Sequence, residues 1–375
     1  MRGIAFREIL HRSMNVAKQT MYVLMAPNWR DTNPYLDLLA RELEAFRIKV
    51  ILSDIPTGPF ALTRLRIAHP LTRILHLHWP DPLFVPVTWS RRGWRRSIRR
   101  ILFKFDVIFS RALGFRLIWT IHNAASHESP DREEEVRLSR FLARIAHKTI
   151  VHSRGALETL RSSYGEHCLP PSKAVVIRHG NYAGCYPPNN EKTTELRKLW
   201  RLNPSDLVIL FFGQVRPYKG LETLIGAFRK ATRADLRLVI AGNPRTNEIQ
   251  KTLETATTVD PRIHLALERI PDADVAAYLD VADVVAIPFE NTLTSGSSML
   301  AMTHGKALIL PASARMLDLG NNDSAIFFEQ IDDLAKRIQQ LNKAILRDMG
   351  ARNHRLAEQL SWNTIAAETF RAYLT

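Results

Sequence analysis

Short apolar runs alternate with segments of helical periodicity along most of this 375-residue chain. In the first half, the apolar runs are Met21–Ala26, Lys49–Ser53, Ile74–His78, Arg116–His122 and Lys148–His152. Uninterrupted runs of this length are typical of strands covered on both faces, as in a parallel sheet. With helices between them, as at Pro34–Phe46, they predict a doubly wound α/β domain.

A second series of the same kind follows in the other half. Its expected strands are Leu207–Phe212, Leu236–Ala241, Ile263–Ala266, Val284–Ile287, Ala307–Leu310 and Ala325–Phe328. Residues 181–203 between the two series carry paired prolines and a polar run, which favours a linker. We therefore expect two Rossmann-like domains, at 1–183 and 196–358, with a linker at 184–195 and an interdomain cleft. We expect a C-terminal helix at about 360–375 to pack back onto the first domain.

The stretch Phe211–Leu221, FFGQVRPYKGL, is the most informative for chemistry. A buried strand ends at Gly213, and Arg216 and Lys219 stand just before a new helix. Ligands of open α/β sheets bind at the carboxyl ends of strands, and a helix N-terminus there attracts phosphate. Arg216 and Lys219 are suited to bind the same diphosphate. The alternative is that both are solvated surface cations.

A second candidate anion site spans Thr294, Ser295, Gly296, Ser297 and Ser298, before an expected helix at about Gly296–His304. Hydroxyls and a glycine at a helix start suit both N-capping and close approach of a phosphate. Capping alone is the alternative.

The acidic pattern Asp272-Ala273-Asp274 has the DxD form of metal-dependent glycosyltransferases. It opens an apolar-periodic helix, where acidic residues are expected as caps, so we interpret it as a cap.

In the first domain, polar residues cluster after the expected strands and should face the cleft. They are Asn33, Tyr35, His76, His78, Trp79, Asp81, His122, Asn123, His127 and Glu128. Asp81 and Glu128 are the carboxylates best placed to deprotonate an acceptor hydroxyl, although either could merely cap a helix. His76 and His78 should share one face of a strand. Without a fixed third ligand they do not make a zinc site, and we expect no metal.

The chain carries a large excess of positive charge, which adds one functional expectation. Lys and Arg number 52 against 37 Asp and Glu, a formal net charge of +15, so the surface attracts anions. Much of the excess lies in Arg91–Lys104. There Arg92, Arg95, Arg96, Arg99 and Arg100 alternate at helical spacing with Trp94 and other apolar residues. Such a helix suits an anionic membrane surface. Nucleic-acid binding and a merely solvated helix are the alternatives, but no recognition motif accompanies the charge, so we expect no nucleic-acid partner.

Two cysteines without metal-ligand spacing indicate a reducing compartment. Met1–Thr20 lacks the continuous apolar core of a secretory signal, and no stretch is long and apolar enough to span a bilayer. We therefore expect a cytoplasmic protein that is soluble or peripheral on a membrane.

A series of motifs across both halves resembles a known family. FFGQVRPYKGLETLIGAF is similar to the phosphate loop in the donor domain of GT-B glycosyltransferases. The ordered series resembles bacterial exopolysaccharide β-mannosyltransferases of the xanthan type. It comprises DTNPYL (Asp31–Leu36), HLHWP (His76–Pro80), TIHN (Thr120–Asn123), RPYKGLE (Arg216–Glu222), AGNP (Ala241–Pro244) and TSG (Thr294–Gly296).

The resemblance implies a metal-independent, inverting transfer from a nucleotide sugar, GDP-mannose in the xanthan case. The acceptor would be an oligosaccharide on a polyprenyl diphosphate at the cytosolic face of the inner membrane. It implies donor-binding residues Gly213, Arg216, Lys219, Asn243, Glu290, Thr294, Ser295, Gly296 and Ser297. It also implies acceptor-binding residues Asn33, Tyr35, His78, Trp79, His122 and Asn123, with Asp81, His127 and Glu128 as catalytic candidates.

One departure concerns Glu290. Retaining GT-B enzymes have a second Glu eight residues later, where this chain has Ser298. Retaining chemistry is therefore disfavoured. Two other functions stay open from the sequence: a GT-B transferase that uses UDP-glucose or UDP-glucuronate, and a non-catalytic binder of nucleic acid or polyanions.

Overall fold

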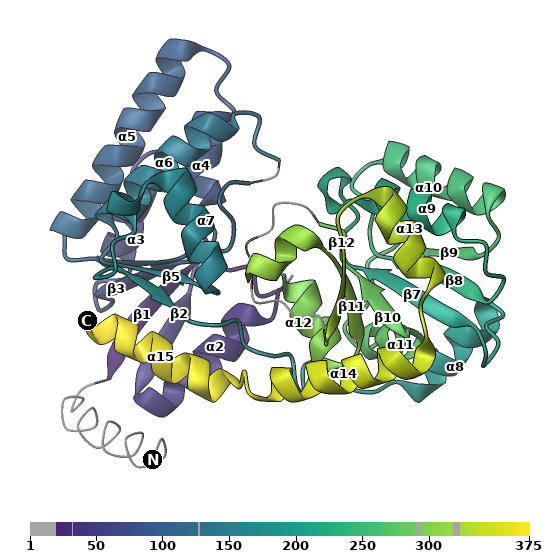
Figure 1. Cartoon of the computed structure of the whole chain (residues 1–375). Coiled ribbons are helices and arrows are strands. Elements are labelled where there is room, and N and C mark those ends of the chain that lie inside the picture. The colour runs from purple at the N-terminus through teal and green to yellow at the C-terminus, as the bar shows by residue number, and fades with distance from the viewer. Residues whose placement is uncertain (1–19, 32, 127, 290–292, 294, 318–322) are drawn as a thin grey trace. The chain divides into compact units, whose positions relative to one another are not determined.

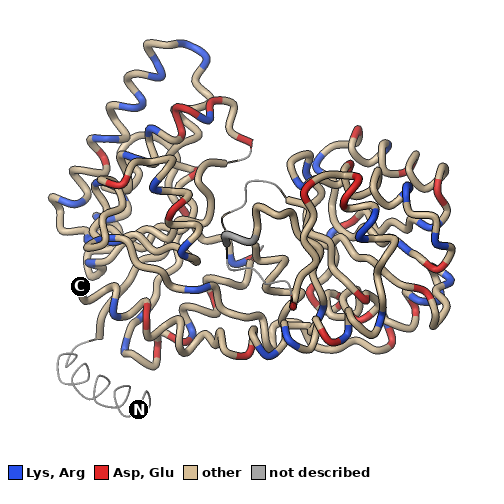
Figure 2. Tube along the Cα trace, viewed as in Figure 1, with Lys and Arg blue, Asp and Glu red and all other residues tan. Residues whose placement is uncertain are grey.

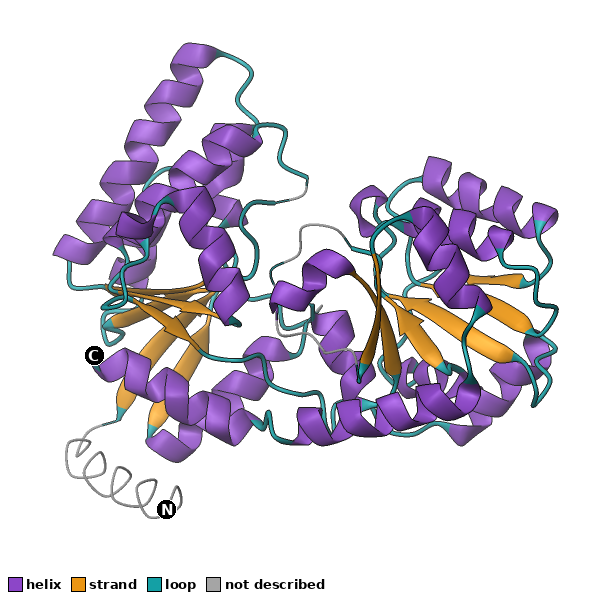
Figure 3. Cartoon of the chain, viewed as in Figure 1, coloured by secondary structure: helices purple, strands orange, loops and turns teal. Residues whose placement is uncertain are grey.

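The computed structural model describes residues 20–31, 33–126, 128–289, 293, 295–317 and 323–375. It divides into two compact units, one of Met1–Arg178 with Trp362–Thr375 and the other of His179–Ser361. Each unit has a six-stranded parallel sheet with helices on both faces (Figures 1 and 3). The predicted α/β fold with two doubly wound sheets is confirmed.

The first sheet has the strand order β2-β1-β3-β4-β5-β6, and all neighbouring strands are parallel. Its strands are β1 (Met21–Ala26), β2 (Ile48–Leu52), β3 (Ile74–Leu77), β4 (Arg116–Thr120), β5 (Lys148–Val151) and β6 (Ala174–Val176). Its helices are α2 (Tyr35–Leu43), α3 (Ala61–Ala68), α4 (Asp81–Thr88), α5 (Gly93–Ala112), α6 (Arg132–Ile145), α7 (Arg154–Tyr164) and α15 (Trp362–Leu374), with short 3₁₀ turns at Glu44–Phe46 and Glu166–Cys168.

One face of this sheet is covered by α2 and by α15, the last helix of the chain, which lie side by side below it in Figure 1. In α2, Leu36, Leu39 and Leu43 recur at helical spacing, so a single stripe of the helix is buried. They join residues of α15 in one hydrophobic cluster with the sheet. The ring of Trp362 in α15 meets the ring of Tyr35 edge-on, with centroids 5.0 Å apart. This apolar contact holds the C-terminal helix in the first unit.

The second sheet has the order β12-β11-β10-β7-β8-β9, again with parallel neighbours. Its strands are β7 (Leu207–Phe212), β8 (Leu236–Ala241), β9 (Ile263–Ala266), β10 (Val284–Ala286), β11 (Ala307–Pro311) and β12 (Ala325–Phe328). Its helices are α8 (Asn190–Leu199), α9 (Leu221–Lys230), α10 (Asn247–Val259), α11 (Val275–Val281), α12 (Gly296–Thr303), α13 (Ile331–Gln339) and α14 (Lys343–Glu358), with 3₁₀ turns at Pro217–Lys219 and Ala312–Leu317.

Two details differ from the expectations. Residues 184–195, expected as a linker, lie within the second unit, and α8 begins among them at Asn190. Asn189 caps α8 by accepting a hydrogen bond from the Lys192 amide at 3.0 Å. Asp274 of the acidic pattern stands at the start of α11, but its side chain makes no capping bond. Its carboxylate instead accepts from Asn189 Nδ2 at 3.0 Å, so this aspartate fastens α8 to α11.

In each sheet the strand order reverses direction once along the chain. The reversal falls between β1 and β3 in the first sheet and between β7 and β10 in the second. Loops that leave the carboxyl ends of two such strands diverge to opposite sides, which opens a crevice where ligands bind. The fold therefore singles out four loops, those after β1, β3, β7 and β10.

Candidate functional site

The loop after β7 and the start of α12 after β10 bring cationic and hydroxyl groups together in the second unit. A methyl group built on the Cα of Gly213 would lie 3.6 Å from both Lys219 Nζ and Ser297 Oγ. Gly213 itself has a positive φ of 121°, which a residue with a side chain rarely adopts. The bare glycine thus leaves space beside an ammonium and a hydroxyl.

The backbone around this space is packed so tightly that side chains are excluded. A Cβ on Gly220 would overlap the carbonyl oxygen of Pro288, and one on Gly242 would overlap that of Gly213. Both glycines also have positive φ. The loop after β8 is tied to the loop after β7, because the Val215 amide donates to the Asn243 carbonyl at 3.0 Å. Asn243 is exposed beside this rigid crossing.

Lys219 is the electrostatic feature of this site. Its Nζ lies 4.6 Å from the centre of the Phe289 ring, a cation–π contact. Among the described residues no carboxylate forms an ion pair with it. Burial, and then the neighbouring Arg216, lower the pKa of Lys219 to about 8. An ammonium that has no ion-pair partner among the described residues and is destabilised by a second cation favours binding of an anion.

Arg216 and the start of α12 complete the arrangement. The Arg216 guanidinium donates to Gln214 Oε1 at 3.0 Å, which holds it over the same loop. Ser295 caps α12 by accepting from the Ser298 amide at 3.1 Å, so capping accounts for that hydroxyl. Ser297, two residues on, is the hydroxyl that lies beside Gly213, as Lys219 Nζ does. Glu290 and Thr294, expected near the donor, lie outside the described residues.

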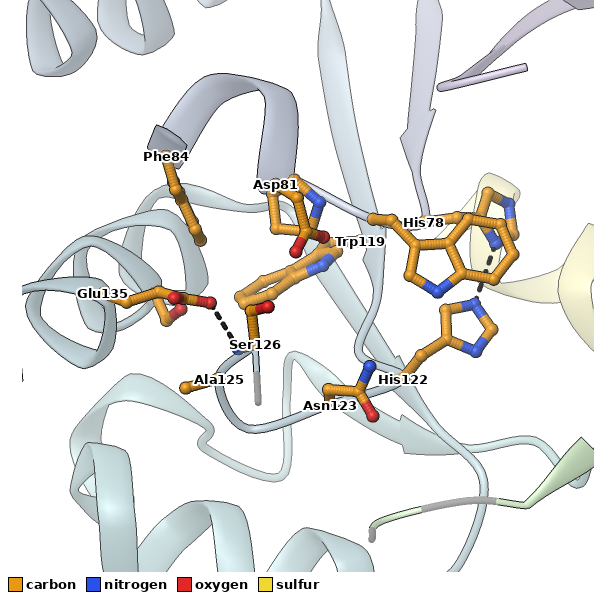
Figure 4. Close-up of a pocket in the computed structure, with 12 residues that line it drawn as sticks. His78, Asp81, Phe84, Trp119, His122, Asn123, Ala125, Ser126 and Glu135 are labelled. Carbon is orange, nitrogen blue, oxygen red and sulfur yellow. Dashed lines mark hydrogen bonds between the residues drawn. The ribbon is translucent and has the colours of Figure 1, made fainter. Parts of the chain in front are cut away.

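In the first unit, the loop after β3 forms a small polar recess (Figure 4). It is lined by twelve residues: His78, Trp79, Pro80, Asp81, Phe84, Trp119, His122, Asn123, Ala125, Ser126, Glu135 and Ser139. Its volume is about 20 Å³, enough for one water molecule or one hydroxyl group. Asp81 begins α4 at its edge, and the Trp119 indole lies below Asp81, with a buried Nε1–H that has no partner among the described residues.

Two carboxylates meet at this recess, and only one of them was expected. Burial raises the pKa of Asp81, partly opposed by hydrogen bonds from its own backbone and from Ser126. Glu135 of α6 accepts from the Ser126 amide at 2.6 Å. Burial raises the pKa of Glu135 as well, and the Asp81 charge adds to this rise. The sequence does not single out Glu135, because it is one of three acidic residues in the first turn of α6, where acidic residues are common.

The alternative base, Glu128, is exposed, and its amide contacts Ser126 Oγ at 3.4 Å. His127 lies outside the described residues. Asp81 is therefore the candidate that combines partial burial, a raised pKa and a polar recess, which are the features a general base needs.

Aromatic rings extend from the recess. Trp79 stacks on His122 with centroids 4.4 Å apart, and on its other neighbour Trp29 with centroids 5.1 Å apart. Trp29, from the loop after β1, was not among the expected residues, because it precedes the polar cluster and the DTNPYL motif of that region. Flat rings stacked in this way suit the apolar face of a sugar. Asn123 is exposed beside them.

Two other expected residues have structural partners. Tyr35 is 2% exposed, and its ring lies edge-on to His78 and His122. It holds these rings in place rather than presenting its side chain at a surface. Asn33 Oδ1 accepts from the Tyr35 amide at 3.0 Å and so fixes the turn that begins α2.

The buried histidines are accounted for in the same way. His76 bonds Tyr373 and Thr120, each at 2.7 Å, and burial followed by the nearby His152 lowers its pKa to about 3. His78 Nδ1 lies 3.3 Å from His122 Nε2, and burial holds the pKa of His78 well below its ordinary value. Both rings are therefore neutral; His76 is a core group, whereas His78 also lines the recess, and its Nε2 has no partner among the described residues. Over the described part of the chain, no set of three His, Cys, Asp or Glu side chains is grouped to hold a metal ion.

Known proteins resemble this chain in sequence and in fold. Residues 206–343 match the family of glycosyl transferases group 1. The GDP-mannose:glycolipid 4-beta-D-mannosyltransferase of Xanthomonas campestris pv. campestris is 27% identical over 241 residues, which cover 64% of this chain and 61% of that enzyme. A D-inositol 3-phosphate glycosyltransferase of Corynebacterium efficiens is 26% identical over 281 residues, 68% of this chain and 65% of the relative. The match thus spans about three fifths of the length of the relatives.

Solved structures resemble the whole chain. Sucrose-phosphate synthase from Thermosynechococcus elongatus has a TM-score of 0.74 at 16% identity, covering 95% of this chain and 98% of that one. Anabaena HepE in complex with UDP has a TM-score of 0.70 at 14% identity, covering 95% and 99%. The chain therefore has the GT-B fold of two-domain glycosyltransferases. Its residues 206–343 match the model of glycosyl transferases group 1, and the predicted resemblance to GT-B glycosyltransferases is confirmed.

Proposed function

We propose that the protein is a glycosyltransferase that moves a hexose from a nucleotide sugar to a lipid-linked oligosaccharide, with inversion at the anomeric carbon. The observation that carries the proposal is the group formed by Lys219 Nζ, Ser297 Oγ and the bare Gly213 at the reversal point of the second sheet. These groups bind the donor diphosphate, together with Arg216, Asn243, Ser295 and Gly296.

The chemistry follows from charge. As the bond between the sugar and the diphosphate breaks, negative charge grows on the departing phosphate oxygen. Lys219, Arg216 and the amide groups at the start of α12 are fixed in advance and stabilise that charge without a metal. On the first unit, Asp81 takes the proton of the acceptor hydroxyl, which attacks the face of the sugar opposite the leaving group. Attack from that face inverts the anomeric configuration.

The donor we propose is GDP-mannose, and the linkage a β-linkage, as part of exopolysaccharide synthesis. Support comes from the similarity to the Xanthomonas enzyme, whose name gives GDP-mannose as donor and a glycolipid as acceptor. The exposed ring of Trp29, backed by the stacked rings of Trp79 and His122, supplies a platform for the acceptor sugar.

We also propose that the enzyme is cytoplasmic and works at the anionic surface of the inner membrane. Lys and Arg positions recur along α5, where they are blue on the backbone tube of Figure 2. Arg92, Arg95 and Arg99 are exposed there, and the Arg95 guanidinium lies 5.2 Å from the centre of the exposed Trp94 ring. Arg96 and Arg100 have another task, since they pair with Asp131 at 2.6 Å and Glu134 at 3.1 Å. Of the described helices, none has both the length and the apolar character to cross a bilayer.

The test compares donors directly. Thermal unfolding is followed with GDP-mannose, UDP-glucose, UDP-glucuronate, GDP and UDP, because a ligand that binds the folded state raises Tm by mass action. Transfer to a lipid-linked oligosaccharide is then measured by mass spectrometry with the donor that stabilises most. We expect GDP-mannose to stabilise and to be consumed. If no nucleotide sugar stabilises the protein while heparin binds with a steep salt dependence, the protein is a polyanion binder and the proposal is wrong.

A further inference from the structure

A second pocket in the first unit lies along α4 and is much larger than the polar recess. Its volume is about 360 Å³. That is more than twice the roughly 150 Å³ that accommodates benzene, and it falls in the range of about 300–1,000 Å³ typical of ligand sites. It is lined by the segment before α3, by α4 and by α5, chiefly through Phe60, Leu83, Pro86, Val87, Leu102 and Phe103.

Two charged residues also line this pocket, and their positions differ. Asp106 is buried, and its two carboxylate oxygens accept from the Leu62 and Thr63 amides at 2.8 Å each, so the start of α3 compensates its charge. Arg99 is exposed, and its Nη1 donates to the Pro86 carbonyl at 2.8 Å. That contact uses one of the five N–H donors of the guanidinium and fixes it beside the pocket. The pocket thus combines an apolar wall with one anchored cation.

The helix that forms one wall is apolar on its outer side too. Trp94, Ile98, Ile101, Phe105 and Ile108 follow one another at spacings of four and three residues, so they form a single stripe. Each is between 48% and 60% exposed. The buried residues of the helix, such as Phe103 and Val107, lie on the opposite side. Exposed apolar surface of this extent marks an interaction site, and exposed Arg95 and Lys104 flank it.

We propose that this pocket binds the hydrocarbon chain of the lipid-linked acceptor, with the Arg99 guanidinium on the lipid phosphate. This inference rests on the proposed function and names the lipid part of its substrate. We choose this occupant because of α4: the helix begins at the candidate base Asp81 and also lines the pocket through Val87. Six residues of helix span about 9 Å, so one short rigid element joins the candidate base to the pocket. The outer stripe of α5, by contrast, contacts the bilayer surface as a whole.

Binding is tested without any reliance on activity. The probe is farnesyl phosphate below its micelle concentration, with binding followed by isothermal calorimetry on the full chain. Leu102→Trp fills the pocket, and Ile101→Trp is the matched control one residue away on the exposed stripe. We expect saturable binding of one farnesyl phosphate, weakened at least tenfold by Leu102→Trp and unchanged by Ile101→Trp. Equal binding by Leu102→Trp and wild type would overturn the proposal, provided that both keep the same Tm.

Two further binding experiments test the role of Arg99 and the kind of lipid that the pocket binds. Arg99→Gln should weaken farnesyl phosphate at least fivefold but leave farnesol unaffected. Monomeric dihexanoylphosphatidylglycerol should not compete with farnesyl phosphate; if it does, the pocket binds bulk phospholipid and the proposed occupant is wrong. Binding of farnesyl phosphate by a protein that turns over no nucleotide sugar would refute the proposed function and keep the lipid pocket.

With an active enzyme, the pocket is tested through its acceptor. Leu102→Trp should raise KM for the lipid-linked acceptor at least tenfold, with little change for a water-soluble acceptor of the same sugar sequence that lacks the chain. Equal losses on both acceptors would contradict a role in holding the lipid.

Discussion

The pKa of Lys219 gives a quantitative prediction for donor binding. With a pKa of about 8, the free protein carries the ammonium in roughly nine tenths of molecules at pH 7 and in roughly one tenth at pH 9. The diphosphate of a nucleotide sugar is fully ionised throughout this range. If binding requires the ammonium, Kd for GDP-mannose should rise about tenfold from pH 7 to pH 9.

Two substitutions isolate the cause. Lys219→Arg puts a permanent cation in place and should flatten the pH dependence, whatever its effect on absolute affinity. Lys251→Arg, on the exposed face of α10, is the matched control and should keep the wild-type profile. Tyr218 does not interfere, because burial raises its pKa above the ordinary value for tyrosine.

The same pKa makes a prediction about stability with the opposite sign. A folded-state pKa below the ordinary 10.5 means that the charged form is disfavoured in the fold. This penalty is fully present below about pH 8 and disappears as pH rises through 10.5, because over that interval the unfolded chain binds more protons. At pH 7 it is on the order of 3 kcal/mol.

Lys219→Met should therefore raise the free energy of unfolding at pH 7 while it abolishes donor binding. The two measurements are urea denaturation and calorimetric titration with GDP-mannose at pH 7, 8 and 9. A flat wild-type binding profile, or a Lys219→Met variant that is less stable than wild type and still binds donor, would refute the reasoning.

Three further predictions concern the recess and the loop crossing. Asp81→Asn should lower kcat by about 10²–10⁴ and leave Kd for the donor unchanged, as single-turnover transfer and calorimetry would show. The same variant should also lower the pKa of Glu135, because the Asp81 charge raises it; an NMR titration of the Glu135 carboxyl would show this, and an unmoved pKa would mean that the two carboxylates do not interact. Gly242→Ala should destabilise the protein by at least about 2 kcal/mol in urea titration, whereas Gly93→Ala, with no atoms within 4 Å of the added Cβ, should not.

The sequence by itself determined the local order of the chain. Five strands, including Met21–Ala26, Leu207–Phe212 and Leu236–Ala241, have the predicted bounds, since continuous apolar runs fit a sheet buried on both faces. It also indicated Gly213, Lys219, Trp79 and Asp81, because each lies between such a strand and the first turn of the next helix. β6 was missed, since three residues carry too short a pattern to be recognised.

Only the tertiary structure decided which of these residues meet. Lys219 and Ser297 are 78 positions apart (297 − 219), and the placement of β7 beside β10 in the sheet brings both to Gly213. In the same way, Glu135 becomes a partner of Asp81 only because α6 packs on α4.

In helix α5, too, the sequence predicts the element and the tertiary structure decides which side is buried. Its sequence predicts an amphipathic basic helix, but periodicity cannot say which side faces the core. In the structure Asp106 and Phe103 turn inward while the stripe from Trp94 to Ile108 turns outward. Arg96 and Arg100 are bound by acidic groups of α6. The physical reason is that burial and pairing depend on what lies opposite a side chain, and the neighbours come from segments distant in the sequence.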